Sequence, residues 1–115
     1  MDVTVNDLAL GDRQALVVAV DGELDGGSAT LVEERAQPAI CERRPLILDL
    51  SSCTFIDSIG LRLVLRLQRA LGAIAMQMVV VIGQPNVWRV FSMTSVSNRV
   101  RVFLDRDAAT HWLAA

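Results

Sequence analysis

Ser58 and the carboxylate of Asp57 before it are the side chains in this sequence best placed to do chemistry. They follow the apolar run Leu46–Leu48 and a short polar connection, at the point where a strand pattern gives way to a helical one. One serine hydroxyl is thereby presented at the start of a helix, beside an acid and with no base or metal ligand nearby in the sequence. Such a hydroxyl suits reversible modification better than catalysis.

Catalytic and nucleotide-binding interpretations of this region fail on particular residues. The element is comparable to the nucleophile elbow G-x-S-x-G of hydrolases, but Ile56 replaces the first glycine, and the only histidine, His111, falls in the predicted terminal helix. The glycines Gly22, Gly26 and Gly27 match neither the dinucleotide fingerprint nor the nucleoside-triphosphate loop, and the chain has no lysine. We therefore expect no catalytic residue, no metal site and no cofactor.

Phosphorylation of Ser58 is one interpretation of this setting, and a small residue at a helix start with no further role is the other. Free backbone N–H groups at the helix start would stabilise a phosphate by about 0.3–1 kcal/mol. The neighbouring carboxylate of Asp57 opposes the phosphate's charge of about −1.5 to −2. The two effects nearly offset within the domain, so either state should fold. At a partner's interface, however, a new dianion against apolar or acidic groups would break a complex of ordinary affinity.

Other charged residues near this element have both a structural and a functional interpretation. Asp21 and Asp25 lie among glycines at a strand end and are typical turn formers. Asp57 is expected to be the helix N-cap and also to set the electrostatics around Ser58. The arginines at four- and three-residue spacings on the same predicted helix form either a solvated face or a surface for an acidic partner: Arg62, Arg66 and Arg69.

Length and composition predict a single cytosolic domain. The 115 residues are 52% apolar, and the net charge of −2 offers no basic surface for a nucleic acid. The N-terminal MDVTVND lacks the charged start of a secretory signal, and the apolar segment Leu71–Ile82 is well short of the roughly 20 residues that a membrane span needs. Cys41 and Cys53 are expected to be reduced thiols used as small apolar residues.

Hydrophobic patterning predicts one α/β domain of about five strands and four helices, in the order β-β-α-β-α-β-α-β-α. A hairpin that turns at Gly11-Asp12 opens the chain, and the remaining strands should form a mostly parallel sheet with right-handed crossovers. The predicted strands span Val3–Leu8, Ala15–Val20, Leu46–Leu50, Met76–Ile82 and Val100–Leu104, and the helices begin near Ser28, Ser58, Pro85 and Asp105 or Asp107.

Four residues carry more specific structural predictions. Ser28 should cap the first helix, and Pro38 should kink that helix or end it at Gln37. Gly72 should form the C-cap of the second helix. Trp88 should lie in the core, because an exposed tryptophan is unusual on a small monomer.

Three segments with preserved spacing carry a resemblance to a known family. They are Gly22-Glu23-Leu24-Asp25, then Asp57-Ser58-Ile59-Gly60-Leu61 after the connection DLSSCTFI, and Pro85-Asn86-Val87-Trp88-Arg89-Val90-Phe91. Together they resemble the STAS domain of bacterial anti-sigma factor antagonists, from about Val3 to Leu113. The resemblance implies a binding module that is not an enzyme. The unmodified domain would bind a serine-kinase anti-sigma factor and free a sigma factor. The kinase, which holds the ATP, would then phosphorylate Ser58 and break the complex, and a serine phosphatase would reverse the modification.

The same resemblance implies a set of partner-binding residues and leaves one alternative function open. The set is Asp25, Asp57, Ser58, Ile59, Gly60, Arg62 and Arg66. The chain departs from the family pattern at Ile59, where a second small or hydroxyl residue is usual, and at Arg62, where a small residue often stands. It departs again at Thr94-Ser95-Val96, where a glycine-containing turn is usual. Related STAS domains serve as cytosolic subunits of lipid-exporting ABC transporters, as structural partners that need no phosphorylation cycle.

Overall fold

The computed structural model describes all of residues 1–115 and contains six strands, four α-helices and one short 3₁₀ helix. The predicted succession of strands and helices is confirmed, with β4 as an additional strand. The elements are β1 (Asp2–Leu10), β2 (Arg13–Leu24), α1 (Ala29–Cys41), β3 (Leu46–Leu50), β4 (Cys53–Ile56), α2 (Ser58–Ala73), β5 (Met78–Ile82), α3 (Pro85–Met93), η1 (Ser95–Asn98), β6 (Arg101–Phe103) and α4 (Arg106–Ala114).

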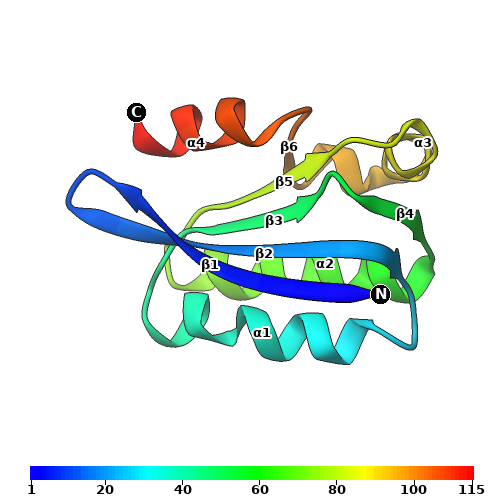
Figure 1. The fold of residues 1–115 in the computed structure, drawn as a ribbon, viewed down its shortest axis with the longest axis horizontal. Coiled ribbons are helices and arrows are strands. Elements are labelled where there is room, and N and C mark those ends of the chain that lie inside the picture. Colours follow the sequence, from blue (N-terminus) through cyan, green and yellow to red (C-terminus); the bar gives the residue numbers. More distant parts are fainter.

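The sheet has the strand order β1-β2-β3-β5-β6 (Figure 1). The hairpin predicted at Gly11-Asp12 is confirmed, since β1 pairs antiparallel with β2, while all other pairs are parallel. Every residue of β3 and of β5 is buried, as the lack of alternation in β3 and the uninterrupted apolar run of β5 predict for strands covered on both faces.

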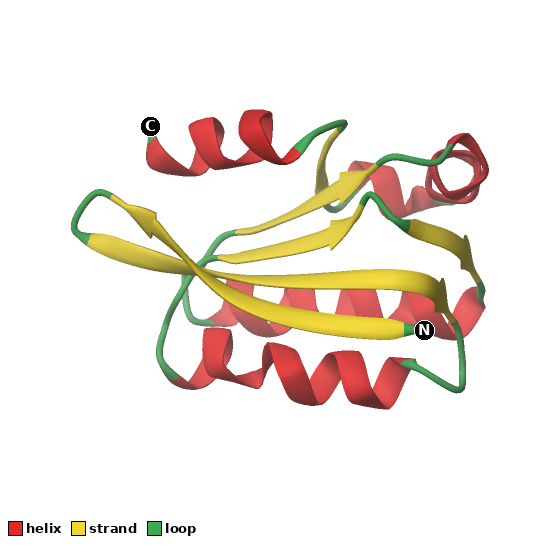
Figure 2. Ribbon diagram, in the orientation of Figure 1, coloured by secondary structure: helices red, strands yellow, loops and turns green.

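Helices cover both faces of the sheet (Figures 1 and 2). α1 and α2 lie side by side on one face and enclose the main core of 25 buried residues, to which α3 contributes Val87 and Phe91. α4 lies on the other face, where Ala109 and Leu113 pack in a second core of 8 buried residues. No helix has the length and apolar character that crossing a bilayer requires.

β4 pairs with the end of β2 because β2 changes its neighbour along its length. Residues 16–19 of β2 pair with β3, whereas Gly22, Glu23 and Leu24 pair with β4 across a register shift. Gly22 lies at that shift with φ +111, a conformation that L side chains rarely adopt. Only the two end residues of β4, Cys53 and Ile56, are buried. The strand therefore shows neither alternation nor an apolar run, and the sequence predicts a plain connection instead.

One of the two alternatives predicted for Pro38, that it ends the first helix, is wrong, and so is the cap predicted at Gly72. α1 does not end at Gln37 but continues through Pro38 to Cys41, and buried Ala36 and Ala39 hold this last turn on the core. α2 is not capped at Gly72. It runs to Ala73, and the residue in the left-handed region is Ala75, with φ 59.

The prediction that Trp88 lies in the core is also wrong. The helix α3 turns Val87 and Phe91 fully inward, which leaves Trp88, the next residue after Val87, 42% exposed. Its indole lines an apolar pocket of about 240 Å³ at the end of β5, together with Pro85 and Leu104.

An ion pair joins α4 to the central strand β3. Nε and Nη2 of Arg106 donate to Oδ2 of Asp49, at 2.9 and 2.6 Å, while Oδ1 accepts from the backbone N–H of Ser51 at 2.9 Å. Burial alone would raise the pKa of Asp49, but the hydrogen bonds from Ser51 and the charge of Arg106 outweigh it and hold this pKa below its usual value. The charged carboxylate therefore stabilises the fold above about pH 4, the ordinary range of the unfolded group, and loses this contribution as the pH falls through the lower folded value.

Asp49→Asn is expected to lower the free energy of unfolding by about 2 kcal/mol at pH 7, because it removes a charge-assisted pair from a buried position. The loss should shrink at pH 3, because the carboxyl of the unfolded chain is then largely protonated and the charged native carboxylate contributes less to stability. Urea denaturation at both pH values measures it. Asp21→Asn is the matched control, since Asp21 lines the same hollow but is exposed and should change little. If Asp49→Asn lowered the free energy of unfolding equally at both pH values, the charged form of the Asp49 carboxylate would not be what stabilises the fold.

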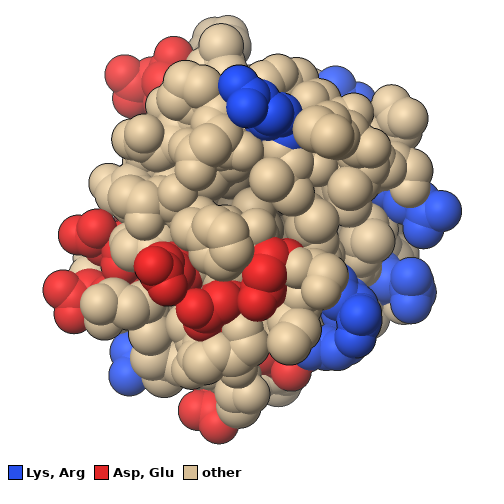
Figure 3. Space-filling model, turned by 90° about the vertical axis from the view of Figure 1, so that its right-hand side faces the viewer, with Lys and Arg blue, Asp and Glu red and all other residues tan.

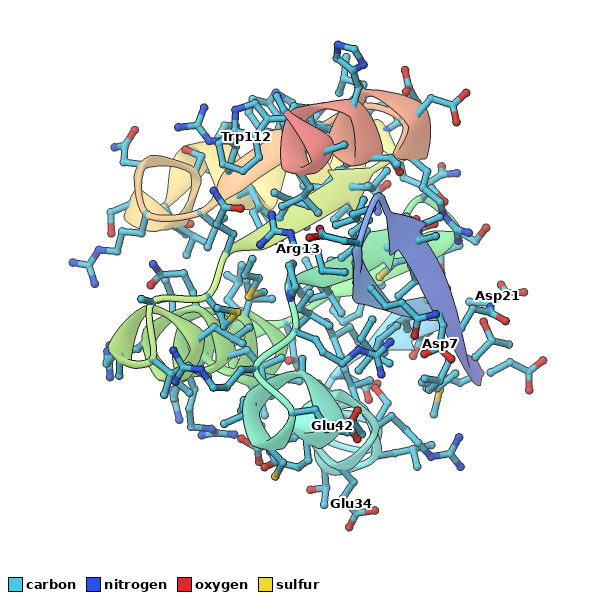
Figure 4. All side chains as sticks on the ribbon, turned by 90° about the vertical axis from the view of Figure 1, so that its left-hand side faces the viewer. Asp7, Arg13, Asp21, Glu34, Glu42 and Trp112 are labelled. Carbon is cyan, nitrogen blue, oxygen red and sulfur yellow. The ribbon has the colours of Figure 1, made fainter.

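A second set of ion pairs lies at the opposite end of the molecule from Ser58. Arg44 pairs with Asp7 of β1 and with Glu42 just after α1. Figure 4 labels the two acidic residues at this end of the molecule. Nearby, Nη2 of Arg13 donates to the carbonyl of Leu113 in α4 at 3.1 Å. These contacts stabilise the end of the molecule that carries the hairpin. They lie far from Ser58, which is positioned by other residues.

Candidate functional site

Ser58 is exposed in the first turn of α2, at the end of the sheet where β4 and the start of α2 meet. The predicted N-cap role of Asp57 is confirmed: its Oδ1 accepts the backbone N–H groups of Ile59 and Gly60, at 3.0 and 2.9 Å. The expectation of free N–H groups beside Ser58 is therefore wrong at these two positions, because the cap has already occupied them. The hydroxyl of Ser58 itself lies open to a visiting protein.

Gly60 fixes where α2 begins. A Cβ atom at this position would lie 2.3 Å from the carbonyl oxygen of Leu24 and 2.8 Å from Cγ1 of Ile56. The same Leu24 oxygen accepts the backbone N–H of Asp57 at 3.3 Å. Only a residue without a side chain allows the helix to start this close to the end of β2, and this contact sets the position of Ser58.

The loop after β2 is joined to α2 through Asp57 and ordered by Asp25. Oδ2 of Asp57 accepts the N–H of Gly26 at 3.3 Å, and Oδ1 of Asp25 accepts that of Gly27 at 2.9 Å. The prediction that the Ser28 side chain caps α1 is wrong. Its buried hydroxyl instead donates to the carbonyl of Glu23 at 2.7 Å and accepts the N–H of Asp25 at 3.0 Å. The turn-forming interpretation of Asp25 thus agrees with its contacts.

Exposed apolar side chains flank Ser58 on both sides in the chain. Phe55 is 48% exposed and Ile59 is 44% exposed, and Cδ1 of Ile59 lies over Gly26, 3.0 Å from where a Cβ would stand. Acidic residues gather in the middle of this end of the molecule, with arginines along one side (Figure 3). Exposed apolar groups beside charges are typical of a protein-binding surface.

Phe55 is a residue of this surface that the sequence interpretation missed. It lies on β4, whose two central residues are both exposed, so no alternation marks it. α3 supports this strand from the side, because the amide of Asn86 donates to the carbonyl of Thr54 at 2.6 Å. The one feature of the sequence that could have indicated Phe55 is that it is the only aromatic residue between the buried strand β3 and Asp57.

The three arginines of α2 are all exposed as predicted, but they differ in their contacts. Nε of Arg66 lies 2.6 Å from Oε2 of Glu33, and Nη2 lies 3.3 Å from Oε1, so this guanidinium is already paired with α1. Arg62 and Arg69 have no hydrogen-bonded or ion-paired partner. The arginine closest to Ser58 along the helix is therefore free.

The cysteine and the histidine that could act as nucleophile or base lie in unsuitable positions. Burial raises the pKa of the Cys53 thiol, which stays protonated at neutral pH and donates to the carbonyl of Phe55 at 3.2 Å. His111 lies on α4, which covers the other face of the sheet from α2. No cluster of three or more histidine, cysteine or acidic side chains could hold a metal ion. The arrangement can present a hydroxyl and bind a protein surface.

Residues 7–109 match the family model described as the STAS domain. The chain belongs to the STAS family. Its fold is also that of an anti-sigma factor antagonist from Mycobacterium paratuberculosis, at a TM-score of 0.84 and 24% identity, with 99% of this chain and 96% of that chain covered.

Two further solved structures share this STAS fold. The Bacillus cell fate determinant SpoIIAA in its phosphorylated form matches at a TM-score of 0.68 and 22% identity, over 95% of this chain and 99% of that one. The murine anion transporter Slc26a9 matches at a TM-score of 0.70 and 20% identity, over 85% of this chain but only 17% of the transporter. At these identities the likeness establishes the fold.

Proposed function

We propose that this STAS protein is an anti-sigma factor antagonist in the cytoplasm, switched by phosphorylation of Ser58. Its unmodified form binds a serine-kinase anti-sigma factor and so releases a sigma factor. Phosphorylation by that kinase breaks the complex, and a serine phosphatase restores it. The chain acts as a substrate and binding module, and the ATP belongs to the kinase.

The exposed position of Ser58, with exposed Phe55 and Ile59 on either side of it in the chain, is the observation that carries this proposal. A kinase reaches an exposed serine without unfolding the domain, and the two apolar side chains give a partner something to bury. The family match and the solved structures of anti-sigma factor antagonists, one of them phosphorylated, support the same mechanism.

The proposed partner-binding surface is Asp25, Phe55, Asp57, Ser58, Ile59, Arg62 and Arg66. Gly60, which the sequence also suggests for this set, is buried against Leu24 and Ile56 and so positions the surface without contacting the partner. The two apolar side chains of the surface call for an apolar contact on the partner. The carboxylate of Asp57 already accepts three backbone N–H groups, and Arg66 is paired with Glu33, which leaves Arg62 as the unpaired charge on α2 nearest the hydroxyl. The matching partner surface is apolar at its centre, with an acidic group facing Arg62.

Phosphorylation is expected at Ser58 alone. Each serine-kinase anti-sigma factor of the same genome would be incubated with this protein and ATP, and the product mapped by mass spectrometry. One kinase should add a single phosphate at Ser58 and none to Ser58→Ala. Modification elsewhere, or none by any kinase, would overturn the proposal and favour the transporter-subunit alternative.

Arg62→Glu is expected to weaken partner binding about tenfold or more by placing an acid against the partner's acidic group. The unfolding midpoint should change little, because Arg62 is exposed and has no partner within the domain. Calorimetric titration and thermal unfolding measure the two effects. Arg69→Glu, two turns further along α2, is the control that should bind normally. If Arg62→Glu bound the partner normally, Arg62 would not contact the partner, and the arginines of α2 would be an ordinary solvated face.

A further inference from the structure

The start of α2 leaves a phosphate on Ser58 with few donors of its own. The next three backbone N–H groups are already occupied by Asp57: those of Ile59 and Gly60 by its carboxylate, at 3.0 and 2.9 Å, and that of Leu61 by its carbonyl oxygen, at 2.9 Å. The adjacent carboxylate also repels a dianion. A phosphate here therefore needs a cation from a side chain.

Arg62 is the free cation closest to Ser58 along the helix. Arg66 is held by two contacts to Glu33, the shorter at 2.6 Å. Arg69 is unpaired but lies eleven residues beyond Ser58, about 16 Å along the helix axis at a rise of about 1.5 Å per residue. Arg62 is exposed, unpaired and one helical turn away.

Helix geometry directs the Arg62 side chain toward Ser58. Residues four apart are neighbours on a helix surface, and side chains lean toward the helix N-terminus, so an arginine at the later position reaches back over the earlier one. The order of acid first and base second is the favourable one for such a pair. A phosphate also accepts the planar guanidinium in a bidentate arrangement.

We propose that Arg62 binds the phosphate on Ser58, and that this contact withdraws the arginine from the partner. In the unmodified protein the guanidinium is free to bind an acidic group of the partner. After phosphorylation it turns back to its own helix, so release combines the repulsion of a new anion with the loss of an attractive contact. The part that concerns the partner rests on the function proposed above.

Phosphorus NMR on the phosphorylated protein tests the intramolecular contact without any kinase. Phosphoserine is incorporated at position 58 during translation, and the phosphate is titrated between about pH 4.5 and pH 8 in the wild type and in Arg62→Gln, bracketing its second ionisation near pH 6. The phosphate of the wild type should titrate with a midpoint about half a pH unit below that of Arg62→Gln. This difference corresponds to an about threefold lower affinity of the wild-type phosphate for the proton. The difference should shrink in about 1 M salt, which screens exposed charges over about 3 Å.

Arg69→Gln is the matched control and should titrate like the wild type. Equal midpoints for the wild type and Arg62→Gln would overturn the proposal, as would an equal shift in Arg69→Gln. The kinase experiment described above fails or succeeds separately. If the wild-type midpoint is lowered but no kinase phosphorylates Ser58, the contact with Arg62 is supported and the proposed function is wrong. If a kinase phosphorylates Ser58 but the midpoints are equal, the proposed function is supported and the contact is wrong.

Discussion

Gly60→Ala is expected to lower the free energy of unfolding by about 3 kcal/mol, at the upper end of the range for an overpacked site. The added methyl group would lie 2.3 Å from the carbonyl oxygen of Leu24, a backbone atom that cannot rotate away, and 2.8 Å from Ile56. The start of α2 must therefore move away from β2. Urea denaturation measures the loss. Because Ser58 is carried by this turn, the variant should also be a poorer kinase substrate under conditions where it remains folded.

Gly72→Ala on the same helix separates crowding from the general effect of replacing a glycine. A Cβ at Gly72 would have no atom within 4 Å, and alanine is favoured over glycine within a helix by about 1 kcal/mol. This control should be as stable as the wild type or slightly more so. If Gly60→Ala were equally stable, the close approach of α2 to β2 would not be what fixes the position of Ser58.

Ser58→Asp is expected to weaken binding to the anti-sigma factor by about a hundredfold, equivalent to about 2.7 kcal/mol. The substitution places a permanent negative charge on the proposed partner-binding surface that carries exposed Phe55 and Ile59, where the partner would bury apolar surface. Folding should be nearly unaffected, because an acid at the first turn of a helix is compatible with the helix dipole. Calorimetric titration measures the affinity, and urea denaturation measures the stability.

Ser58→Ala is the matched variant that removes the hydroxyl without adding charge. It should bind within about threefold of the wild type and stay bound in the presence of ATP, because the kinase then has no acceptor. An Ala variant that loses affinity as much as the Asp variant would show that the hydroxyl itself contacts the partner. The switch would then not depend on charge.

The main features of the fold can be predicted from local patterns in the sequence. The lack of alternation in β3 and the unbroken apolar run of β5 predict strands buried on both faces, and Pro85 predicts the start of α3. The N-cap role of Asp57 follows from residue type and position, and it is confirmed by two backbone contacts. These features depend on neighbours within a few residues, which is why the sequence alone reveals them.

The features that could not be predicted depend on contacts between distant segments. β4 exists because β2 shifts its register at Gly22 and takes a second neighbour. The pairing of Arg66 with Glu33 joins positions 33 residues apart and arises only when α1 and α2 pack together. The distinction between paired Arg66 and free Arg62, on which the partner surface depends, is therefore invisible in the helical spacing.

The affinity of the protein carrying phosphoserine at position 58 tests the central claim most directly. The same preparation would be titrated into the anti-sigma factor and unfolded in urea, beside the unmodified protein. We predict a loss of affinity of about a hundredfold or more, with the free energy of unfolding changed by less than about 1 kcal/mol. Unchanged affinity, or a loss of affinity that merely follows from an unfolded domain, would contradict a switch in which the phosphate on exposed Ser58 expels the partner.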